Sequence, residues 1–313
     1  WANSLFEDNA EFGYGMYLAV TQRREKLTEV MEKLATGIAG DAVKEAAEKW
    51  LAVKDDKSKS LAVSDEVAEV LKNAEASGEA KELLDFAVKN SDMLAKKSIW
   101  IFGGDGWAYD IGFGGLDHVI ASGEDVNILV FDTEVYSNTG GQSSKATPIG
   151  SVAKFAAAGK SVKKKDLAAI AMSYGYVYTA QICLGADYNQ SIKAITEAES
   201  YNGPSIIIAY APCINHGIKG GMGNSIAEAK NAVNAGYWHN FRFDPRLKEE
   251  GKNPFILDSK APTASFKDFL SNEVRYTSLK LSFPDRADVL FDEAEKAAKE
   301  KYEYLVKLSK LYE

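Results

Sequence analysis

The sequence predicts an α/β fold with a mostly parallel sheet, helices on both faces of that sheet, and a helical insertion. Four short apolar runs lead to this prediction, because their length and composition are typical of buried strands. They lie at residues 98–102, 127–131, 177–183 and 205–210. Helical patterns separate the runs, and a charged, alanine-rich stretch precedes them.

The N-terminal part of the chain is expected to be helical. Apolar residues recur at three- and four-residue spacing over residues 12–34, which predicts a helix. Residues 41–96 repeat Ala, Glu, Lys and Leu, and Gly78 and the polar stretch 54–60 divide them into two or three helices. We expect residues 1–40 to belong to the domain that contains the sheet. Residues 41–96 would form a charged insertion that acts as a spacer or an interface.

Residues 97–237 are expected to form the α/β core. Helical patterns at about 114–122, at 166–174 and at 190–201 alternate with the apolar runs. This alternation is typical of right-handed βαβ units and a parallel sheet with covered faces. Ligands of such sheets bind beyond the carboxyl ends of the strands, so the loops after the four runs are the candidate site.

The last part, residues 238–313, has a different pattern. Short extended pieces surround Pro245, Pro254 and Pro262, and an amphipathic helix follows at about 285–311. We expect this segment to serve in packing or in subunit contact.

Composition excludes several classes of protein. The 313 residues are 46% hydrophobic and 26% charged, which is ordinary for a globular chain. A formal net charge of −8 argues against nucleic acid as a partner, since binding phosphates requires clustered Lys and Arg. No apolar run is long enough to span a membrane, and the first residues lack the order of a signal peptide. We expect a cytoplasmic protein, and because the sequence begins without Met, a fragment or a processed chain.

Two strand ends carry the residues of a candidate metal site. Gly104-Asp105-Gly106 follows the first apolar run, and Asp132-Thr133 follows the second. The residues between them are enough for one helical crossover, so both strand ends would face one ligand. Separately, Gly-Asp-Gly is common in turns, and Asp-Thr suits an N-cap or an Asx turn. Their occurrence together at two strand ends favours a site for a metal-bound diphosphate.

Oxygen ligands for a divalent cation are present at these two ends. Mg²⁺ requires near-octahedral oxygen ligands at about 2.0–2.1 Å. Asp105 would supply the negative charge, and the Thr133 hydroxyl and a backbone carbonyl such as that of Val135 would supply further oxygens. The glycines allow the backbone to approach the phosphates, and the N-terminus of the following helix favours an anion. Neither a dinucleotide fingerprint nor a P-loop is present here.

Residues 104–138 resemble the thiamine diphosphate motif, in which Gly-Asp-Gly is followed after one crossover by an Asn pair. Asp132-Thr133 stands where Asn-Asn is usual, and Asn138 lies a few residues further on. Together with the segments at 4–13 and 211–213, this variant resembles the pyruvate:ferredoxin (flavodoxin) oxidoreductase family. The resemblance covers most of the chain and implies the thiamine-diphosphate-binding fold.

The resemblance implies an enzyme that oxidatively decarboxylates pyruvate with thiamine diphosphate and Mg²⁺. Electrons would pass through 4Fe-4S clusters to ferredoxin or flavodoxin, and the acyl group would form acetyl-CoA. Asp105, Thr133 and the Val135 carbonyl would bind Mg²⁺. Asn138 would be catalytic, hydrogen-bonding the substrate or the developing oxyanion. The expected cofactor-contacting residues are Gly104, Asp105, Gly106, Trp107, Thr133, Glu134, Val135, Tyr136, Ser137 and Asn138.

The resemblance also assigns a role to one of the two cysteines. Cys213 would be the last of four thiolate ligands of a 4Fe-4S cluster, with the other three outside this chain. Cys183 is expected to be a core residue. The three histidines, His118, His216 and His239, are expected to be structural, because thiamine itself supplies the reactive carbon.

The implied partners are pyruvate, coenzyme A, ferredoxin or flavodoxin, the remainder of the same enzyme and, in a homodimer, a second copy. Alone, the chain is not expected to turn over. Two other enzymes remain open: another 2-oxoacid:ferredoxin oxidoreductase, or a cluster-free thiamine-dependent 2-oxoacid decarboxylase. A non-catalytic assembly chain is a third alternative. The basic run at 160–165 favours a solvated loop, and the alternative is a docking surface for an acidic electron carrier.

Overall fold

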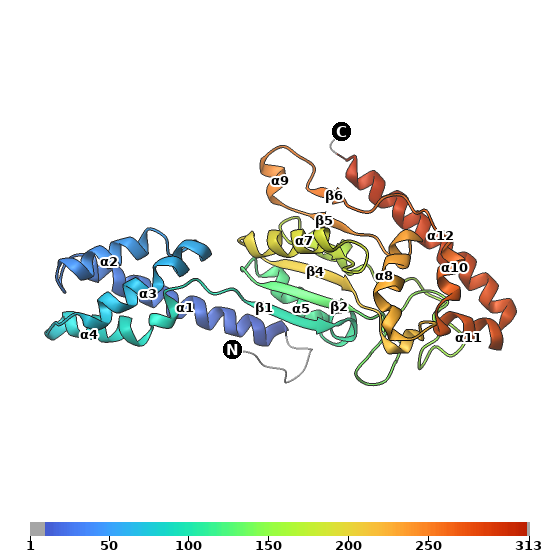
Figure 1. Ribbon diagram of the computed structural model, residues 1–313, viewed down its shortest axis with the longest axis horizontal. Helices are drawn as coiled ribbons and strands as arrows, with labels where there is room; N and C mark the ends of the chain where they lie inside the picture. Colours follow the sequence, from blue (N-terminus) through green and yellow to red (C-terminus); the bar gives the residue numbers. More distant parts are fainter. Residues whose placement is uncertain (1–9, 312–313) are drawn as a thin grey trace. The chain divides into compact units, whose positions relative to one another are not determined.

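The computed structural model of the chain describes residues 10–311 and contains two compact units (Figure 1). A helical unit spans Phe12–Ile99, and an α/β unit is formed mainly by Trp100–Glu313. Within the described residues, no helix has both the length and the apolarity that crossing a membrane requires.

The helical unit packs around an apolar core. Its helices are α1 (Ala10–Leu34), α2 (Asp41–Leu51), α3 (Lys57–Asn73) and α4 (Gly78–Lys89), followed by the short 3₁₀ turn η1 (Ser91–Met93). Trp50 is fully buried, and its Nε1 donates a hydrogen bond to the Leu94 carbonyl at 2.8 Å. Leu27 and Met31 of α1 belong to the same core. The unit therefore begins at residue 12 and not at the expected residue 41, because α1 supplies one side of the core.

The α/β unit contains a six-stranded sheet in the order β1-β2-β4-β3-β5-β6. The strands are β1 (Trp100–Gly104), β2 (Asn127–Asp132), β3 (Tyr178–Ile182), β4 (Ser205–Tyr210), β5 (Phe241–Phe243) and β6 (Phe255–Leu257). The first four are parallel to one another, and β5 and β6 are antiparallel. This confirms the mostly parallel α/β sheet predicted from the apolar runs. The two antiparallel strands come from the segment in which short extended pieces were expected.

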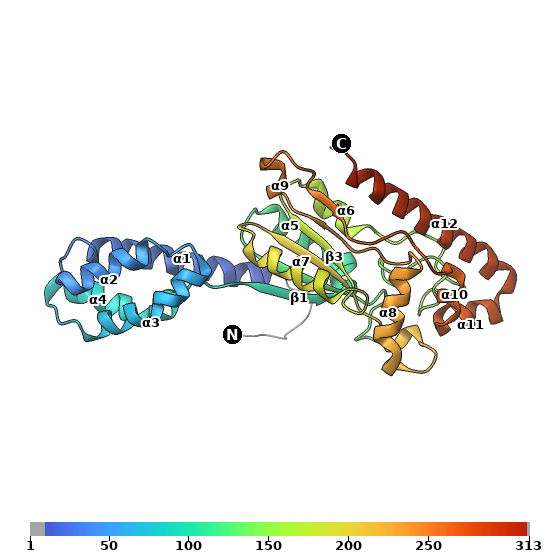
Figure 2. The ribbon, with the colours of Figure 1, turned by 45° about the horizontal axis from the view of Figure 1, so that its top comes forward.

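Helices cover both faces of the parallel strands (Figure 2). The crossover helices are α5 (Phe113–Ala121), α6 (Leu167–Ser173) and α7 (Tyr188–Ser200). The connections through α5 and α6 run in one direction along the sheet, and the connection through α7 runs back. Right-handed crossovers therefore place α7 on the opposite face from α5 and α6. Ala194 and Ala198 of α7 pack on Tyr178 and Ala180 of β3.

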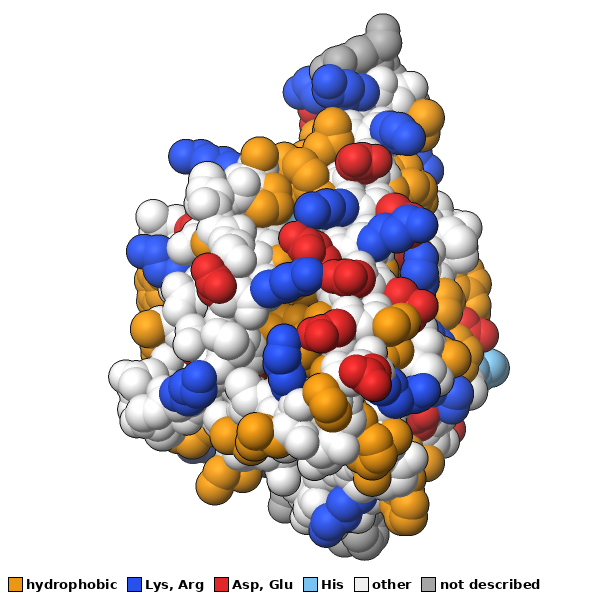
Figure 3. Space-filling view, turned by 90° about the vertical axis from the view of Figure 1, so that its right-hand side faces the viewer, with side chains coloured by type: hydrophobic (Ala, Val, Ile, Leu, Met, Phe, Trp, Pro, Cys, Tyr) orange, Lys and Arg blue, Asp and Glu red, His pale blue; other side chains and the backbone are white. Residues whose placement is uncertain are grey.

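The remaining elements follow the parallel strands. They are η2 (Gly106–Ile111), η3 (Ile214–His216), η4 (Met222–Asn224), α8 (Ser225–Asn234), α9 (Arg246–Glu249), α10 (Phe266–Ser271), α11 (Val274–Ser282) and α12 (Pro284–Ser309). The long helix α12 packs against α11, α10 and β6. On the face that contains these helices, Lys and Arg alternate with Asp and Glu instead of separating by sign (Figure 3). Lys267–Asp292 and Lys280–Asp288 are examples of such pairs.

Candidate metal and diphosphate site

Three strand ends converge on the candidate site. Because β2 lies between β1 and β4, the loops that follow these three strands leave the sheet side by side. Ser137, from the loop after β2, places its Oγ 3.3 Å from the Sγ of Cys213, which follows β4. The loop after β3 differs: Cys183 is buried, and its thiol donates to the Ala229 carbonyl at 3.3 Å. Burial raises the pKa of that thiol to about 11, which agrees with the expected core role.

The three oxygens expected to bind Mg²⁺ lie together. The Thr133 Oγ1 is 2.7 Å from Asp105 Oδ1 and 2.9 Å from the Val135 carbonyl oxygen. We call these three atoms the oxygen trio. Neighbouring ligands of an octahedral Mg²⁺ lie about 2.9 Å apart when each is about 2.0–2.1 Å from the metal. The trio therefore has the ligand chemistry that Mg²⁺ prefers, and Thr133 Oγ1 lies at the distance of an adjacent ligand from each of the other two oxygens.

Asp105 is completely buried, and its carboxylate is fixed from both sides. Its Oδ2 accepts from Ser144 Oγ at 2.6 Å, and its Oδ1 accepts from the Thr133 backbone N–H at 3.1 Å. Burial and the nearby Asp132 carboxylate raise the pKa of Asp105 to about 7. A cation at the trio would offset this cost, because it favours the charged carboxylate.

Close packing around η2 leaves no room for a side chain at Gly106 or Gly112. A Cβ on Gly106 would lie 2.5 Å from the ring of Tyr136, and one on Gly112 would lie 2.0 Å from the ring of Trp107. The Trp107 side chain is buried against Gly112. The helix expected after Asp105 begins as the π-helical segment η2, in which the Gly112 N–H bonds to the Trp107 carbonyl at 2.8 Å. Such segments are rare and often occur at functional sites.

Glu134 lies between Thr133 and Val135, the two residues that supply the neutral oxygens of the trio. Its backbone is strained. Its φ is 61°, in the left-handed region, which costs a residue other than glycine on the order of 1–3 kcal/mol. Its side chain points into the fold and is 1% exposed. The carboxylate contacts Lys164 Nζ at 3.1 Å, Arg275 Nη1 at 2.7 Å and the Tyr237 hydroxyl at 2.5 Å. We call Glu134 and these three partners the anchor cluster.

Charge compensation keeps Glu134 ionised. Burial alone would raise the pKa of Glu134, but Lys164 and Arg275 outweigh burial and lower it to about 2. Glu134 was expected to contact the cofactor. Its carboxylate instead contacts Lys164, Arg275 and Tyr237, so any contact of Glu134 with the cofactor would come from its backbone.

The basic run is not the solvated loop or docking surface considered from the sequence. Lys164 is three-quarters buried and bridges Asp132 at 2.7 Å and Glu134 at 3.1 Å. Lys165 lies over the ring of Phe113 and donates to the Tyr109 carbonyl at 3.0 Å. Among the lysines of the run only Lys163 is mainly exposed, where it pairs with Glu300, and Ser161 and Val162 before it are exposed as well. A run of lysines suggests a surface segment. Composition cannot show that the partners of Lys164, Asp132 and Glu134, are buried at the end of β2.

Asn138 lies in the loop after the trio. A tight hydrogen-bonded turn forms this loop, in which the Tyr136 N–H bonds to the Gln142 carbonyl at 2.9 Å and the Gly141 N–H to the Tyr136 carbonyl at 2.8 Å. The Asn138 side chain is exposed. Ser137 Oγ lies 2.6 Å from Thr133 Oγ1 and so connects the trio to Cys213.

Cys213 is a buried free cysteine surrounded by donors. Besides Ser137, the backbone N–H and the side-chain amide of Asn215 each donate to its sulfur at 3.4 Å. The Ser137 hydroxyl lies 3.3 Å from the same sulfur, but its one proton can go instead to Thr133 Oγ1 at 2.6 Å. Within the described residues, no group of three or more His, Cys, Asp and Glu could hold a metal, so Cys213 has no such partners there.

Two of the three histidines are buried, and one of these two lies next to the site. His216 is fully buried, and its Nε2 donates to the Thr133 carbonyl at 2.7 Å. Burial and Arg275 lower the pKa of His216 to about 3, so it is neutral at neutral pH. His239 is buried beside Tyr302, and His118 is exposed on α5.

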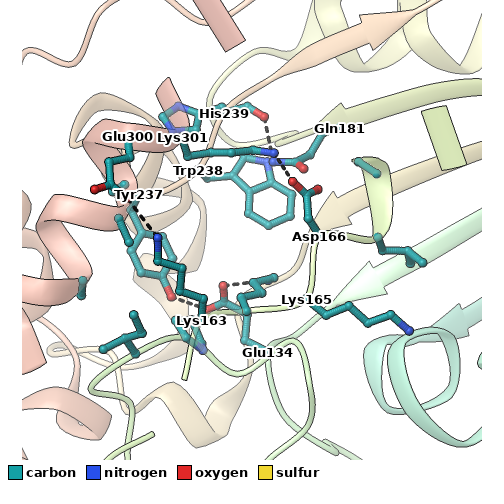
Figure 4. A pocket seen from close by; sticks show the side chains of 18 of the residues that line it. Glu134, Lys163, Lys165, Asp166, Gln181, Tyr237, Trp238, His239, Glu300 and Lys301 are labelled. Atoms are coloured by element: carbon teal, nitrogen blue, oxygen red, sulfur yellow. Dashed lines mark hydrogen bonds and ion pairs between the residues drawn. The ribbon is translucent and has the colours of Figure 1, made fainter. Parts of the chain in front are cut away.

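Several residues that shape the site had no sequence signal. Ser144 binds Asp105, and the Thr147 hydroxyl donates to the Glu134 carbonyl at 2.6 Å. Both come from the loop between β2 and α6, in which no motif was recognised. A cavity of 410 Å³ lies behind the anchor cluster, lined by Glu134, Lys164 and Tyr237 and by residues of α12 (Figure 4). It is separate from the oxygen trio, whose Asp105 and Thr133 do not line it.

Comparison with known proteins agrees with this geometry. Residues 86–209 match the family described as thiamine pyrophosphate enzyme, C-terminal TPP binding domain. The chain is 60% identical over 311 residues to the pyruvate:ferredoxin oxidoreductase of Moorella thermoacetica. It is 55% identical over 302 residues to the pyruvate-flavodoxin oxidoreductase of Klebsiella pneumoniae. The chain matches the thiamine-diphosphate-binding portion of these oxidoreductases.

These alignments take in 99% and 96% of this chain but only 26% of each relative. The chain thus spans about a quarter of the length of the oxidoreductases that it matches. The mitochondrial pyruvate dehydrogenase (NADP⁺) of Euglena gracilis is 47% identical over 292 residues, which are 93% of this chain and 16% of that protein. The same thiamine-diphosphate-binding portion therefore has relatives named for ferredoxin, flavodoxin and NADP⁺.

Proposed function

We propose that this chain binds thiamine diphosphate and Mg²⁺ as part of an enzyme that oxidatively decarboxylates pyruvate and forms acetyl-CoA. The oxygen trio carries this proposal, because it lies in a thiamine-diphosphate-binding domain at the strand ends where ligands of parallel sheets bind. The names of the relatives support pyruvate as the substrate.

The oxygen trio would hold Mg²⁺, and the backbone of residues 104–107 and 133–138 would face the cofactor. Asp105 would offset the charge of the metal, while Thr133 and Val135 would supply neutral oxygens. Bound thiamine diphosphate supplies the carbon that adds to the keto group of a 2-oxoacid and the electron sink for loss of CO₂. Asn138, exposed on the loop after the trio, would hydrogen-bond the substrate oxygen.

Cys213 would be a ligand of a 4Fe-4S cluster whose other three ligands lie outside this chain. Its sulfur accepts two hydrogen bonds from Asn215, and hydrogen bonds to cluster sulfurs help to set the potential. The contact through Ser137 places this ligand next to the metal site, which suits transfer of electrons from the cofactor.

The partners follow from the same proposal. Ferredoxin or flavodoxin would accept the electrons, and coenzyme A would accept the acyl group. The remainder of the enzyme would complete the site, and the whole enzyme would form a homodimer. The two free cysteines fit a reducing compartment such as the cytoplasm.

Two substitutions in the intact enzyme test the two halves of the proposal and serve as controls for each other. Asp105→Ala should abolish Mg²⁺-dependent thiamine diphosphate binding, measured by calorimetry, and should retain iron. Cys213→Ser should retain cofactor binding but lose cluster signals in electron paramagnetic resonance and ferredoxin reduction, because the cluster requires a thiolate. Tight cofactor binding by Asp105→Ala would contradict the metal site. Full iron content and normal ferredoxin reduction in Cys213→Ser would contradict the electron path.

A further inference from the structure

We propose that Glu134 is a positioning residue for Mg²⁺, and that the anchor cluster fixes the turn that presents two of the three metal ligands. This inference rests on the proposed metal site. It adds Lys164, Arg275 and Tyr237 to the residues on which metal binding depends, although none of them belongs to the oxygen trio.

The backbone around Glu134 leaves one carbonyl for the metal. The Thr133 carbonyl accepts from His216 Nε2 at 2.7 Å, and the Glu134 carbonyl accepts from Thr147 Oγ1 at 2.6 Å. Of these three successive carbonyls, that of Val135 faces the Thr133 hydroxyl. Glu134, the middle residue of the three, has a left-handed φ. A strained conformation persists only where its surroundings hold it.

The anchor cluster provides that hold. Figure 4 shows Glu134 and Tyr237 facing each other in the wall of the cavity. Arg275 is held in turn, because its Nε donates to Glu273 Oε2 at 2.6 Å. The side chains of Arg275 and Glu134 are 1% and 2% exposed, so this ion pair lies away from bulk water.

A purely structural role is the alternative, and the chain contains a matched control for it. On β3, the Tyr178 hydroxyl donates to Glu197 at 2.8 Å, and Glu197 pairs with Arg242 at 2.7 Å. This second Tyr–Glu–Arg group repeats the chemistry of the anchor cluster, but none of its members contacts the loop after β2 in any described hydrogen bond or ion pair.

The experiment compares Tyr237→Phe with Tyr178→Phe in the intact enzyme. Each change removes one buried hydroxyl that donates to a glutamate. The apparent dissociation constants of Mg²⁺ and of Ca²⁺ are measured at saturating thiamine diphosphate. Mg²⁺ demands a near-ideal octahedron at about 2.0–2.1 Å, whereas Ca²⁺ accepts about 2.3–2.6 Å and irregular geometry. A displaced turn should therefore weaken Mg²⁺ more than Ca²⁺.

We expect Tyr237→Phe to weaken Mg²⁺ by about tenfold or more, the usual scale for a residue that orients a ligand, and to weaken Ca²⁺ clearly less. Glu134→Gln should show a larger difference between the two metals, and Tyr178→Phe should show none. Equal weakening of both metals, or no weakening of either, would overturn the positioning role. Absence of metal-dependent cofactor binding in the unaltered enzyme would instead contradict the proposed function.

Discussion

The helical unit and the α/β unit use their interiors differently. The buried polar side chains of the helical unit are Ser60, Ser64 and Asn90, and none is charged. The α/β unit buries acids and bases, among them Asp105, Glu134, Glu273 and Arg275. One chain thus contains one apolar core and one core in which ionised groups face one another.

The difference between the two interiors indicates that buried charges serve function more than stability. Buried ion pairs contribute little net stability, because the loss of hydration offsets their attraction. Apolar burial contributes about 25 cal/mol per Å² without such a cost. The α/β unit buries charge in more than one place, and one of these places is beneath the turn that carries the oxygen trio. The helical unit has no comparable group.

The first prediction tests whether the stability of the helical unit affects cofactor binding by the α/β unit. Trp50→Ala should lower the free energy of unfolding of the helical unit by about 3–5 kcal/mol, the usual cost of emptying such a core site. Thiamine diphosphate binding should be unchanged. Urea unfolding followed by circular dichroism and calorimetric titration of the cofactor measure the two effects. A matching loss of cofactor affinity would show that the two units are energetically coupled.

The second prediction concerns an exposed residue of the α/β unit. Asn138→Ala should lower turnover of the intact enzyme by roughly 10²–10³, the scale for one lost oxyanion donor. Its melting temperature should stay the same, because the side chain is exposed. Steady-state kinetics and a thermal melt of the same preparation check this. Unchanged turnover would make Asn138 part of a structural turn only.

Asp105, Thr133 and Cys213 each lie two or three residues after the end of an apolar run. Asp105 and Thr133 come at the ends of predicted strands, and the sheet rule brings such ends together. Their oxygens lie 2.7 Å apart. Cys213 was placed near them by the same rule, together with the family resemblance. The local sequence pattern was sufficient to predict that these residues lie close together, because the parallel sheet brings the ends of its strands to one edge.

The anchor cluster could not be predicted in this way. Glu134 pairs with Lys164 over 30 positions and with Arg275 over 141 positions of sequence. No spacing rule connects such residues. Lys164 is one of three consecutive lysines, and nothing local shows that the middle one is buried. The domain boundary differed for a related reason, since periodicity predicted helix α1 but not the core to which it contributes.

The last prediction compares how acid changes the free energy of unfolding of the two units. Burial and Lys301 lower the pKa of His239 to about 4, from an ordinary value of 6.5. The folded α/β unit thus favours the neutral ring, so this contribution to stability is complete above pH 6.5 and is lost as the pH falls toward 4. By pH 5 the loss should be roughly 1–2 kcal/mol. Urea unfolding at pH 7.5 and 5.0 should show a smaller decrease for His239→Gln than for the unaltered protein, and this difference isolates His239 from other titrating groups. The helical unit contains none of the three histidines, so its transition should lack this decrease. An identical pH dependence in the variant would mean that His239 is protonated in the folded unit without cost, and that its burial imposes no penalty on the charged ring.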